Sequence, residues 1–402
     1  MVDNPKNLFY KRAILKQLYF TNVMSCAEIS TRISRSIPLT TRILEELILE
    51  DYVSEVGFAP SSGGRRPMMY KLQDNIFYVL SVAMDQLVTR ISLVANQNNL
   101  FGEIKRVELP LANNPNALST LAQEIEAVID QSAVDKSRII GVGVGMPGFI
   151  DFKKGVNYSF LELKDQTITQ FLTQKLNLPV FIDNDSSLIG LAELKFGHAR
   201  GRMNSMVLNI SWGVGLGLIL NGELFRGHSG FAGEFSHMPI FNNNKLCSCG
   251  KTGCLETETS LLVLIEKIKA GLQAGRNSVL SKTLSEDNPE KDYEAIIQAA
   301  LKGDQFAIEL LSQAGYHIGR GIAILVHLLN PENIVLSGRG SIGGKLWLTP
   351  IQQALNELCI PRIAERLEIS ISPLGLDAEL IGAAALVMEH YDETNLDQLP
   401  LN

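Results

Sequence analysis

The apolar positions of the first fifty residues recur with the period of an α-helix and predict three short helices. The first helix carries an apolar stripe over about three turns, formed by Leu8, Ile14, Leu15 and Leu18. A second helix is expected from Cys26 to Ile33, because Ser25 and Glu28 have the spacing of a capping box. The pattern is then interrupted at residues 34–35, where a turn is expected.

A third helix is expected from Pro38 to Glu50, with proline in the first turn, where its missing N–H costs little. The apolar face of this helix consists of Ile43, Leu44, Leu47 and Ile48. The opposite face carries Thr41 and Arg42, whereas Thr40 falls where a core residue is expected. A short turn between the second and third helices is typical of a helix-turn-helix.

Two short strands complete the predicted N-terminal domain. Residues 52–56 and 68–72 have strand patterns and are joined by a loop rich in Gly and Ser at 57–67. Three helices followed by a two-stranded wing form the winged helix-turn-helix plan. Its third helix can enter the major groove of DNA, which is wide enough to admit one helix.

Contacts with double-stranded DNA are expected at two places in this domain. Thr41 and Arg42 are the candidates for reading bases, and Arg65 and Arg66 are the candidates at the wing tip. The Gly-Gly pair before Arg65 lets the backbone approach a phosphate or a narrow groove. For any one arginine the alternative is an ordinary surface position on a helical bundle. The agreement of helix lengths, turn and wing tip favours DNA binding.

Beyond residue 77 the pattern changes to strands that alternate with helices. Strands are expected at 78–82, 88–95, 139–144, 180–182, 206–210 and 216–220, and a helix at 123–134. This alternation, repeated in two halves, predicts an α/β protein with a cleft between two lobes. We therefore expect an N-terminal DNA-binding domain at 1–72 and a larger α/β domain at 73–402.

The distribution of charge supports this division. The chain has 402 residues and a net charge of -7, yet residues 1–72 contain ten Lys/Arg against seven Asp/Glu, a balance of +3. An acidic average therefore conceals a basic module. The longest apolar runs, such as 321–326, are far shorter than the roughly 20 residues of a membrane span. The N-terminus has no apolar signal region. We therefore expect a cytoplasmic location and no membrane insertion.

The strongest chemical signal is a histidine followed by three closely spaced cysteines. Three thiolates and one imidazole complete a tetrahedral shell for zinc and leave no position open for water. We therefore expect one structural zinc per chain in a knuckle at 237–256, held by His237, Cys247, Cys249 and Cys254. The alternative is three free thiols packed together by chance, but two glycines in the loop supply the turns that a knuckle needs.

Two acidic residues flank this knuckle. Glu234 lies three residues before the histidine, and Glu256 lies two residues after the last cysteine. Folding the loop on a metal would hold both carboxylates close together, and paired carboxylates suit the neighbouring hydroxyls of a sugar. The alternative is that both glutamates are ordinary partners in surface salt bridges.

Acidic residues also follow a buried strand at Asp183, Asn184 and Asp185. Acids just beyond the end of such a strand usually face the cleft of an α/β sheet. The alternative is that they cap the helix expected at 186–196. The glycine runs at 141–145 and 213–217 also have two interpretations. They can bind an oxygen-rich ligand through backbone N–H groups, or they can fit a tightly packed strand.

Together these motifs resemble the ROK family of transcriptional repressors and sugar kinases. The resemblance rests on residues 145–148, 183–185, 213–217, 234–237, the cysteine knuckle, 330–338 and 382–385. Within the family the chain looks like the repressors of the xylose and N-acetylglucosamine type, which place a winged helix-turn-helix before the kinase-like domain. The resemblance implies a two-lobed, actin-like ATPase (ribonuclease H-like) fold.

The resemblance also implies a sugar site. Carried onto matching positions, it places sugar hydroxyls against Asn184, Asp185, Glu234, His237 and Glu256. His237 would then serve twice, with one ring nitrogen on zinc and the other toward the sugar. Asp185 matches the general base that deprotonates the attacking hydroxyl in the kinases of the family.

Departures from the kinase pattern change the expected function. Ala83 replaces the Asp of the first phosphate motif, and Asp85 and Gln86 replace its paired glycines. Trp212 occupies a Thr position of the second motif, and Arg339 lies among the glycines near the usual adenosine site. Phosphoryl transfer depends on positioning and charge neutralisation. We therefore assign no catalytic residue and do not expect ATP or magnesium as cofactors.

The sequence as a whole favours a sugar-responsive repressor of carbohydrate-utilisation genes. One small winged module buries too little surface for tight specific binding, so a homodimer on a pseudo-palindromic operator is expected. An ATP-dependent sugar kinase with an appended DNA-binding domain is the alternative. A third possibility is a regulator that is controlled by a protein partner instead of a sugar.

Overall fold

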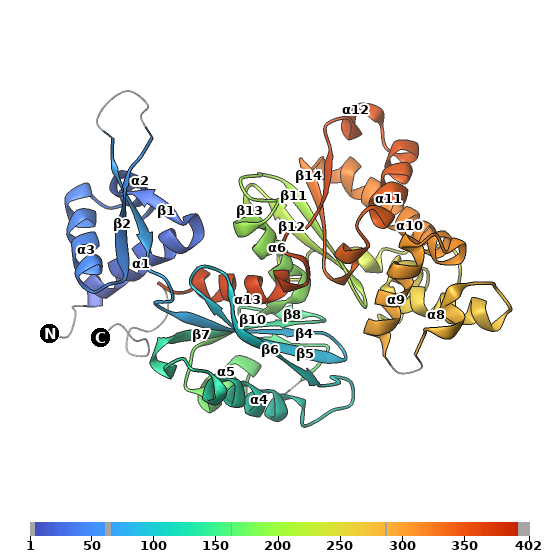
Figure 1. Ribbon diagram of the computed structural model, residues 1–402, viewed down its shortest axis with the longest axis horizontal. Coiled ribbons are helices and arrows are strands. Elements are labelled where there is room, and N and C mark those ends of the chain that lie inside the picture. Colours follow the sequence, from blue (N-terminus) through green and yellow to red (C-terminus); the bar gives the residue numbers. More distant parts are fainter. Residues whose placement is uncertain (1–4, 61–65, 162, 286–287, 393–402) are drawn as a thin grey trace. The chain divides into compact units, whose positions relative to one another are not determined.

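The computed structural model describes residues 5–60, 66–161, 163–285 and 288–392 (Figure 1). The chain forms two compact units, of which the first comprises residues 1–185 and 380–402 and the second comprises residues 186–379. Each unit has its own five-stranded sheet and its own hydrophobic core.

Residues 5–72, the N-terminal module of the first unit, form three helices and a small sheet (Figure 1). In chain order the elements are α1 (Pro5–Thr21), β1 (Val23–Ser25), α2 (Cys26–Arg32), α3 (Ile37–Leu49), β2 (Val53–Phe58) and β3 (Met68–Leu72). The sheet has the order β1-β3-β2, and both pairs are antiparallel. The three predicted helices and two wing strands are confirmed. Strand β1 was not predicted, because three residues are too few to show a pattern.

Local hydrogen bonds explain the two turns of this module. Ser25 and Glu28 form the predicted capping box, in which the Ser25 N–H donates to Glu28 Oε2 at 2.8 Å. Ser34 has a φ of 54°, the left-handed conformation that ends α2 and lets the chain turn toward α3. Thr40 is fully buried, and its hydroxyl donates to the Ser36 carbonyl at 3.1 Å. A polar side chain is therefore accommodated in the core without an unsatisfied donor.

The larger sheet of the first unit has the order β10-β7-β4-β5-β6. Its strands are β4 (Tyr78–Met84), β5 (Val88–Ala95), β6 (Leu100–Glu108), β7 (Ile139–Met146) and β10 (Val180–Asn184), and a small ribbon is formed by β8 (Ile150–Asp151) and β9 (Val156–Asn157). Helices α4 (Ala117–Gln131) and α5 (Ile168–Leu176) lie on one face, and α13 (Ala378–Glu389) lies on the other (Figure 1). The strands predicted at 78–82, 88–95, 139–144 and 180–182 are confirmed, but the helix expected from residue 123 begins six residues earlier. Strand β6 was not predicted, because its half-exposed sequence has no clear alternation.

The second unit is built on a sheet of order β13-β12-β11-β14-β15. Its strands are β11 (Ser205–Ile210), β12 (Val214–Leu220), β13 (Glu223–Leu224), β14 (Asn333–Ser337) and β15 (Glu368–Ile371). Its helices are α6 (Asp185–Phe196), α7 (Glu256–Thr259), α8 (Leu261–Gln273), α9 (Pro289–Leu301), α10 (Gln305–Leu329), α11 (Lys345–Leu358) and α12 (Pro361–Ala364). Short 3-10 turns occur at Lys136–Arg138, Phe235–His237, Val279–Lys282, Arg339–Gly343 and Gly375–Asp377. The long helix α10 packs against α8, α9 and α11.

The glycine runs serve close packing between helices and sheets. A Cβ atom on Gly143 in β7 would lie 2.1 Å from the Ala383 carbonyl oxygen of α13. A Cβ atom on Gly217 in β12 would lie 2.7 Å from the Cα of Gly190 in α6. Only glycine allows these helices to lie so near their strands. Of the two readings of the glycine runs, packing accounts for these positions.

Within the first unit, the segment that follows α13 contacts the first helix of the N-terminal module. We call residues 389–392 the anchor segment. The Lys16 ammonium donates to the Glu389 carbonyl oxygen at 2.6 Å and to Asp392 Oδ1 at 2.7 Å. Helix α1 and the anchor segment are therefore joined by a half-buried ion pair.

Aromatic rings continue this contact. The Phe77 ring lies between Tyr19 of α1 and Tyr391 of the anchor segment, with centroid separations of 6.3 and 5.9 Å. The Arg12 guanidinium lies over the Tyr391 ring at 5.6 Å. All four side chains are buried, and burial raises the pKa of both tyrosines. This aromatic cluster was not predicted, because its members are far apart along the chain.

Candidate functional site

The predicted metal ligands come from a 3-10 turn and a tight loop of the second unit. His237 ends the turn Phe235–His237, and the three cysteines precede α7. We call residues 237–256 the metal loop. Isolated β-bridges pair Pro239 with Cys254 and Leu246 with Thr252. Gly253 has a φ of 78°, and its Cβ would lie 2.1 Å from a backbone oxygen, so the loop requires glycine there.

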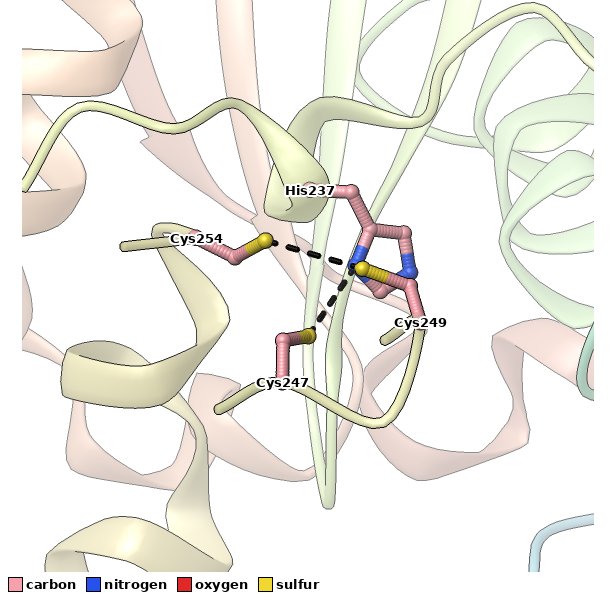
Figure 2. A group of neighbouring side chains, drawn as sticks. All are labelled: His237, Cys247, Cys249 and Cys254. Atoms are coloured by element: carbon pink, nitrogen blue, oxygen red, sulfur yellow. Dashed lines mark hydrogen bonds between the residues drawn. The ribbon is translucent and has the colours of Figure 1, made fainter. Parts of the chain in front are cut away.

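The four predicted ligands converge (Figure 2). Their ligand atoms all lie within 4.8 Å of one another. Cys247 Sγ lies 3.4 Å from His237 Nδ1, and Cys249 Sγ lies 3.7 Å from Cys254 Sγ. Burial, together with the neighbouring thiols, raises the pKa of Cys254 to about 12. One nitrogen with three sulfurs is a donor set that suits zinc. This cluster could hold a metal ion.

The second nitrogen of His237 faces a carboxylate. Its Nε2 lies 3.7 Å from Glu234 Oε2, whereas its Nδ1 lies 3.4 Å from Cys247 Sγ. Burial raises the pKa of Glu234; His237 opposes this change, and the charge of Glu256 adds to it. Glu256 Oε2 accepts a long hydrogen bond from the Val214 N–H at 3.4 Å. The structure thus brings Glu234, His237 and Glu256 together, beside the metal ligands.

Glycine at the start of β12 makes room for this carboxylate. A Cβ atom on Gly213 would lie 2.8 Å from Glu256 Oε2. The role of Gly213 is therefore to admit a side chain of this cluster, which the sequence alone did not indicate.

The acidic sequence at the end of β10 belongs to the first unit. The strand runs two residues further than predicted, so that it includes Asp183 and Asn184, and Asp185 begins α6. Asp183 is buried and accepts from the Asn184 N–H at 2.8 Å. The Asn184 amide donates to the Gly148 carbonyl at 3.2 Å. Asn184 and Asp185 are half-buried.

The positions that depart from the kinase pattern have local roles in this fold. Asp85 Oδ1 accepts hydrogen bonds from the N–H groups of Leu87 and Val88, at 2.8 and 2.7 Å, and so shapes the β4–β5 turn. The Gln86 carbonyl accepts a long bond from Leu111. Ala83 is buried within β4. Asp85 therefore closes the turn between β4 and β5.

Trp212 and Arg339 meet in the second unit. The Arg339 guanidinium lies over the Trp212 ring at 4.8 Å and forms a salt bridge with Glu290. Both Trp212 and Arg339 are buried. Glu290 was not foreseen as a partner, because nothing in the sequence links α9 to residue 339.

The candidate DNA-binding residues lie on the N-terminal module. Arg42 is exposed on α3 and donates to Asn7 Oδ1 at 3.3 Å, and Glu46 lies 3.7 Å from it. Thr41 is half-buried, and its hydroxyl lies 3.3 Å from Cys26 Sγ. Arg66 is exposed at the end of the wing loop, while Arg65 lies outside the described residues. Among the described residues, the helices are all too short or too polar to cross a membrane.

A family model described as the ROK family matches residues 89–390. The chain belongs to the ROK family. A xylose repressor from Caldicellulosiruptor bescii is 30% identical over 386 residues, which cover 94% of this chain and 95% of the repressor. A glucokinase from Halalkalibacterium halodurans is 33% identical over 276 residues, which cover 67% of this chain and 83% of the kinase.

Solved structures agree with this membership. A ROK family transcriptional regulator, described as a homologue of the Escherichia coli MLC protein, superimposes with a TM-score of 0.77 at 26% identity. The match covers 97% of this chain and 98% of that one. The predicted fold, a winged helix-turn-helix followed by the ROK sugar-kinase fold, is confirmed. The division at residue 72 stays a prediction.

Proposed function

We propose that this chain is a sugar-responsive, DNA-binding repressor of carbohydrate-utilisation genes. The observation that carries the proposal is the presence, in one chain, of a winged helix-turn-helix and a ROK domain with an acidic cluster beside a metal-binding loop. The ROK relatives that extend over almost the whole chain are named as repressors and regulators. The protein acts in the cytoplasm as a homodimer on a pseudo-palindromic operator.

The metal is a structural zinc, one per chain. His237, Cys247, Cys249 and Cys254 fill a tetrahedral shell, so no position remains for an activated water. The metal fixes the start and the end of the loop, and thereby orients the imidazole and Glu256. Its contribution is geometric rather than catalytic.

The sugar is bound beside this metal loop. Glu234, Glu256 and Nε2 of His237 present two carboxylates and one ring nitrogen close to one another. Carboxylates accept short, strong hydrogen bonds from neighbouring hydroxyls. Glucose, xylose and N-acetylglucosamine all present such hydroxyl pairs. Asn184 and Asp185 of the first unit remain candidates for further hydroxyl contacts.

Kinase activity is the second candidate function, supported by the glucokinase relative and by Asp185. Four departures from the kinase pattern argue against it. Ala83 offers no metal ligand, Asp85 puts a negative charge where phosphate would lie, and the stacked Trp212 and Arg339 occupy space that a nucleotide would need. We therefore assign no enzymatic activity to the chain.

A three-part experiment tests this function on the purified full-length protein. Selection from randomised duplex DNA should return a pseudo-palindrome, and one sugar of a panel of hexoses, pentoses and N-acetylhexosamines should raise the melting temperature. A coupled assay with ATP and the same panel should show no turnover. Robust turnover would establish the kinase. Operator binding without any response to sugars would favour a protein regulator.

A further inference from the structure

One side of α3 faces away from the module. Its buried side consists of Thr40, Ile43, Leu44 and Leu47. Helical geometry places Arg42 and Glu45 on the opposite side, together with Pro38 and Leu49. Arg42, Glu45 and Leu49 are all exposed. Glu45 lies one turn beyond Thr41, at the centre of the exposed side.

The two neighbouring acids of α3 are held by α1. Glu46 accepts from Asn7 Nδ2 at 2.6 Å and lies 3.6 Å from the Lys11 ammonium. Glu50 forms a salt bridge with Lys11 at 2.6 Å. These carboxylates have a structural role, because they fasten α3 to the helix beside it.

Glu45 differs from both. Among the described residues it has no hydrogen bond and no salt bridge, and its side chain is exposed. Its neighbour Arg42 is held by Glu46 and Asn7 instead. Structural pairing therefore does not explain the presence of an acid at this position.

An acid on a surface that meets DNA is repelled by the phosphates. The major groove offers one compensating group, the N4 amino group of cytosine, which donates a hydrogen bond to a carboxylate. Arginine at a neighbouring position suits guanine, through its O6 and N7. Arg42 and Glu45 are separated by about 4.5 Å along the helix axis, close to the ~3.4 Å between successive bases.

We infer that Glu45 is a specificity-determining residue that reads a cytosine next to the guanine read by Arg42. This inference rests on the proposed operator binding. In each half-site Arg42 supplies attraction to guanine and to the nearby phosphates. Glu45 rejects any base that presents an acceptor instead of the cytosine amino group.

Two variants of Glu45 give different expected results in operator selection from randomised DNA. Glu45→Ala removes the acceptor, so one position of each half-site loses its cytosine preference by roughly 5- to 150-fold. Glu45→Gln presents an amide that pairs with adenine at N6 and N7, so the preference at that position moves from cytosine to adenine. The guanine preference assigned to Arg42 remains in both variants.

Glu55→Gln is the matched control, because Glu55 is an exposed acid on β2 of the same module. It removes the same charge, so any general gain in affinity for DNA should appear in the control as well. The base preference of this control should equal that of the unaltered protein. Thermal unfolding of all the variants should coincide with that of the parent, since both glutamates are exposed.

The outcomes separate this inference from the function on which it rests. If the unaltered protein selects an operator and Glu45→Ala selects the same bases at every position, Glu45 does not read DNA. If the unaltered protein selects no sequence, operator binding itself fails. A cytosine preference that changes in Glu55→Gln but not in the Glu45 variants would also overturn the inference.

Discussion

The N-terminal module and the metal loop are held together by different forces. The module has a core of aliphatic side chains spread over three helices, and Ile14, Ile29, Ile43 and Leu47 are all fully buried. The metal loop has isolated β-bridges in place of regular strands, and its Leu246 is 75% exposed. Apolar burial is divided among many contacts, whereas the loop, with the proposed zinc bound, would depend on one cluster of four ligands. One substitution in the core of the module should therefore remove only part of its stability. Loss of one metal ligand should disrupt the whole loop.

The largest effect is expected from breaking the metal cluster. Cys249→Ser should reduce the zinc content from one per chain to nearly none and abolish the thermal shift with sugar, because the loop orients His237 and Glu256. Operator binding in the absence of sugar should persist. Metal analysis and calorimetry on the same samples provide the measurements.

Cys359→Ser is the matched control for this variant, since Cys359 is a buried free thiol outside the cluster. It should retain both zinc and the sugar response. A Cys249→Ser protein that still responds normally to sugar would show that the metal and the sugar site are independent.

The next effect concerns the aliphatic core of the module. Ile43→Ala should cost about 2–5 kcal/mol of stability, through lost burial and the cavity left behind. DNA binding should fall with the folded fraction while the response to sugar remains. Leu49→Ala, at an 86% exposed position of the same helix, should change stability by less than about 0.5 kcal/mol. Equal losses in the two variants, measured by denaturant unfolding, would mean that α3 is not packed as described.

Smaller effects are expected for the two arginines proposed to contact DNA. Arg42→Ala should weaken operator binding roughly 5- to 150-fold and relax one base preference. Arg66→Ala should weaken binding to all DNA sequences alike. It should also reduce the slope of log affinity against log salt concentration by about one. Titrations at several salt concentrations distinguish the two. If the two variants show the same change in base preference and in salt dependence, the division into base and backbone contacts is wrong.

The smallest effect is a change in pH dependence in the second unit. Burial raises the pKa of Glu193, although hydrogen bonds from Ser372 and the His198 N–H oppose it. Between the ordinary value of 4.5 and the raised one, the folded state binds more protons than the unfolded state. Stability should therefore decline as the pH rises through this range. Glu193→Gln should flatten the decline in unfolding curves; an unchanged slope would exclude Glu193 as its source.

The sequence predicted features that depend on nearby residues. The capping box of Ser25 and Glu28 and the convergence of His237 with three cysteines both follow from spacing within one segment. It did not predict the partner of Arg339, which is Glu290, because that contact joins elements far apart in the chain. It left open the purpose of Gly143, which became clear only from the Ala383 carbonyl of α13.

The anchor segment has a consequence for biosynthesis. Lys16 and Asp392 are 376 residues apart, so α1 leaves the ribosome long before its partner is made. At about 5–20 residues per second, that interval lasts roughly 20 to 75 seconds. During it, Arg12 and Phe77 lack the ring of Tyr391 that later packs against them. A chain that stops before residue 389 carries every element of the winged helix, but its first helix is never secured.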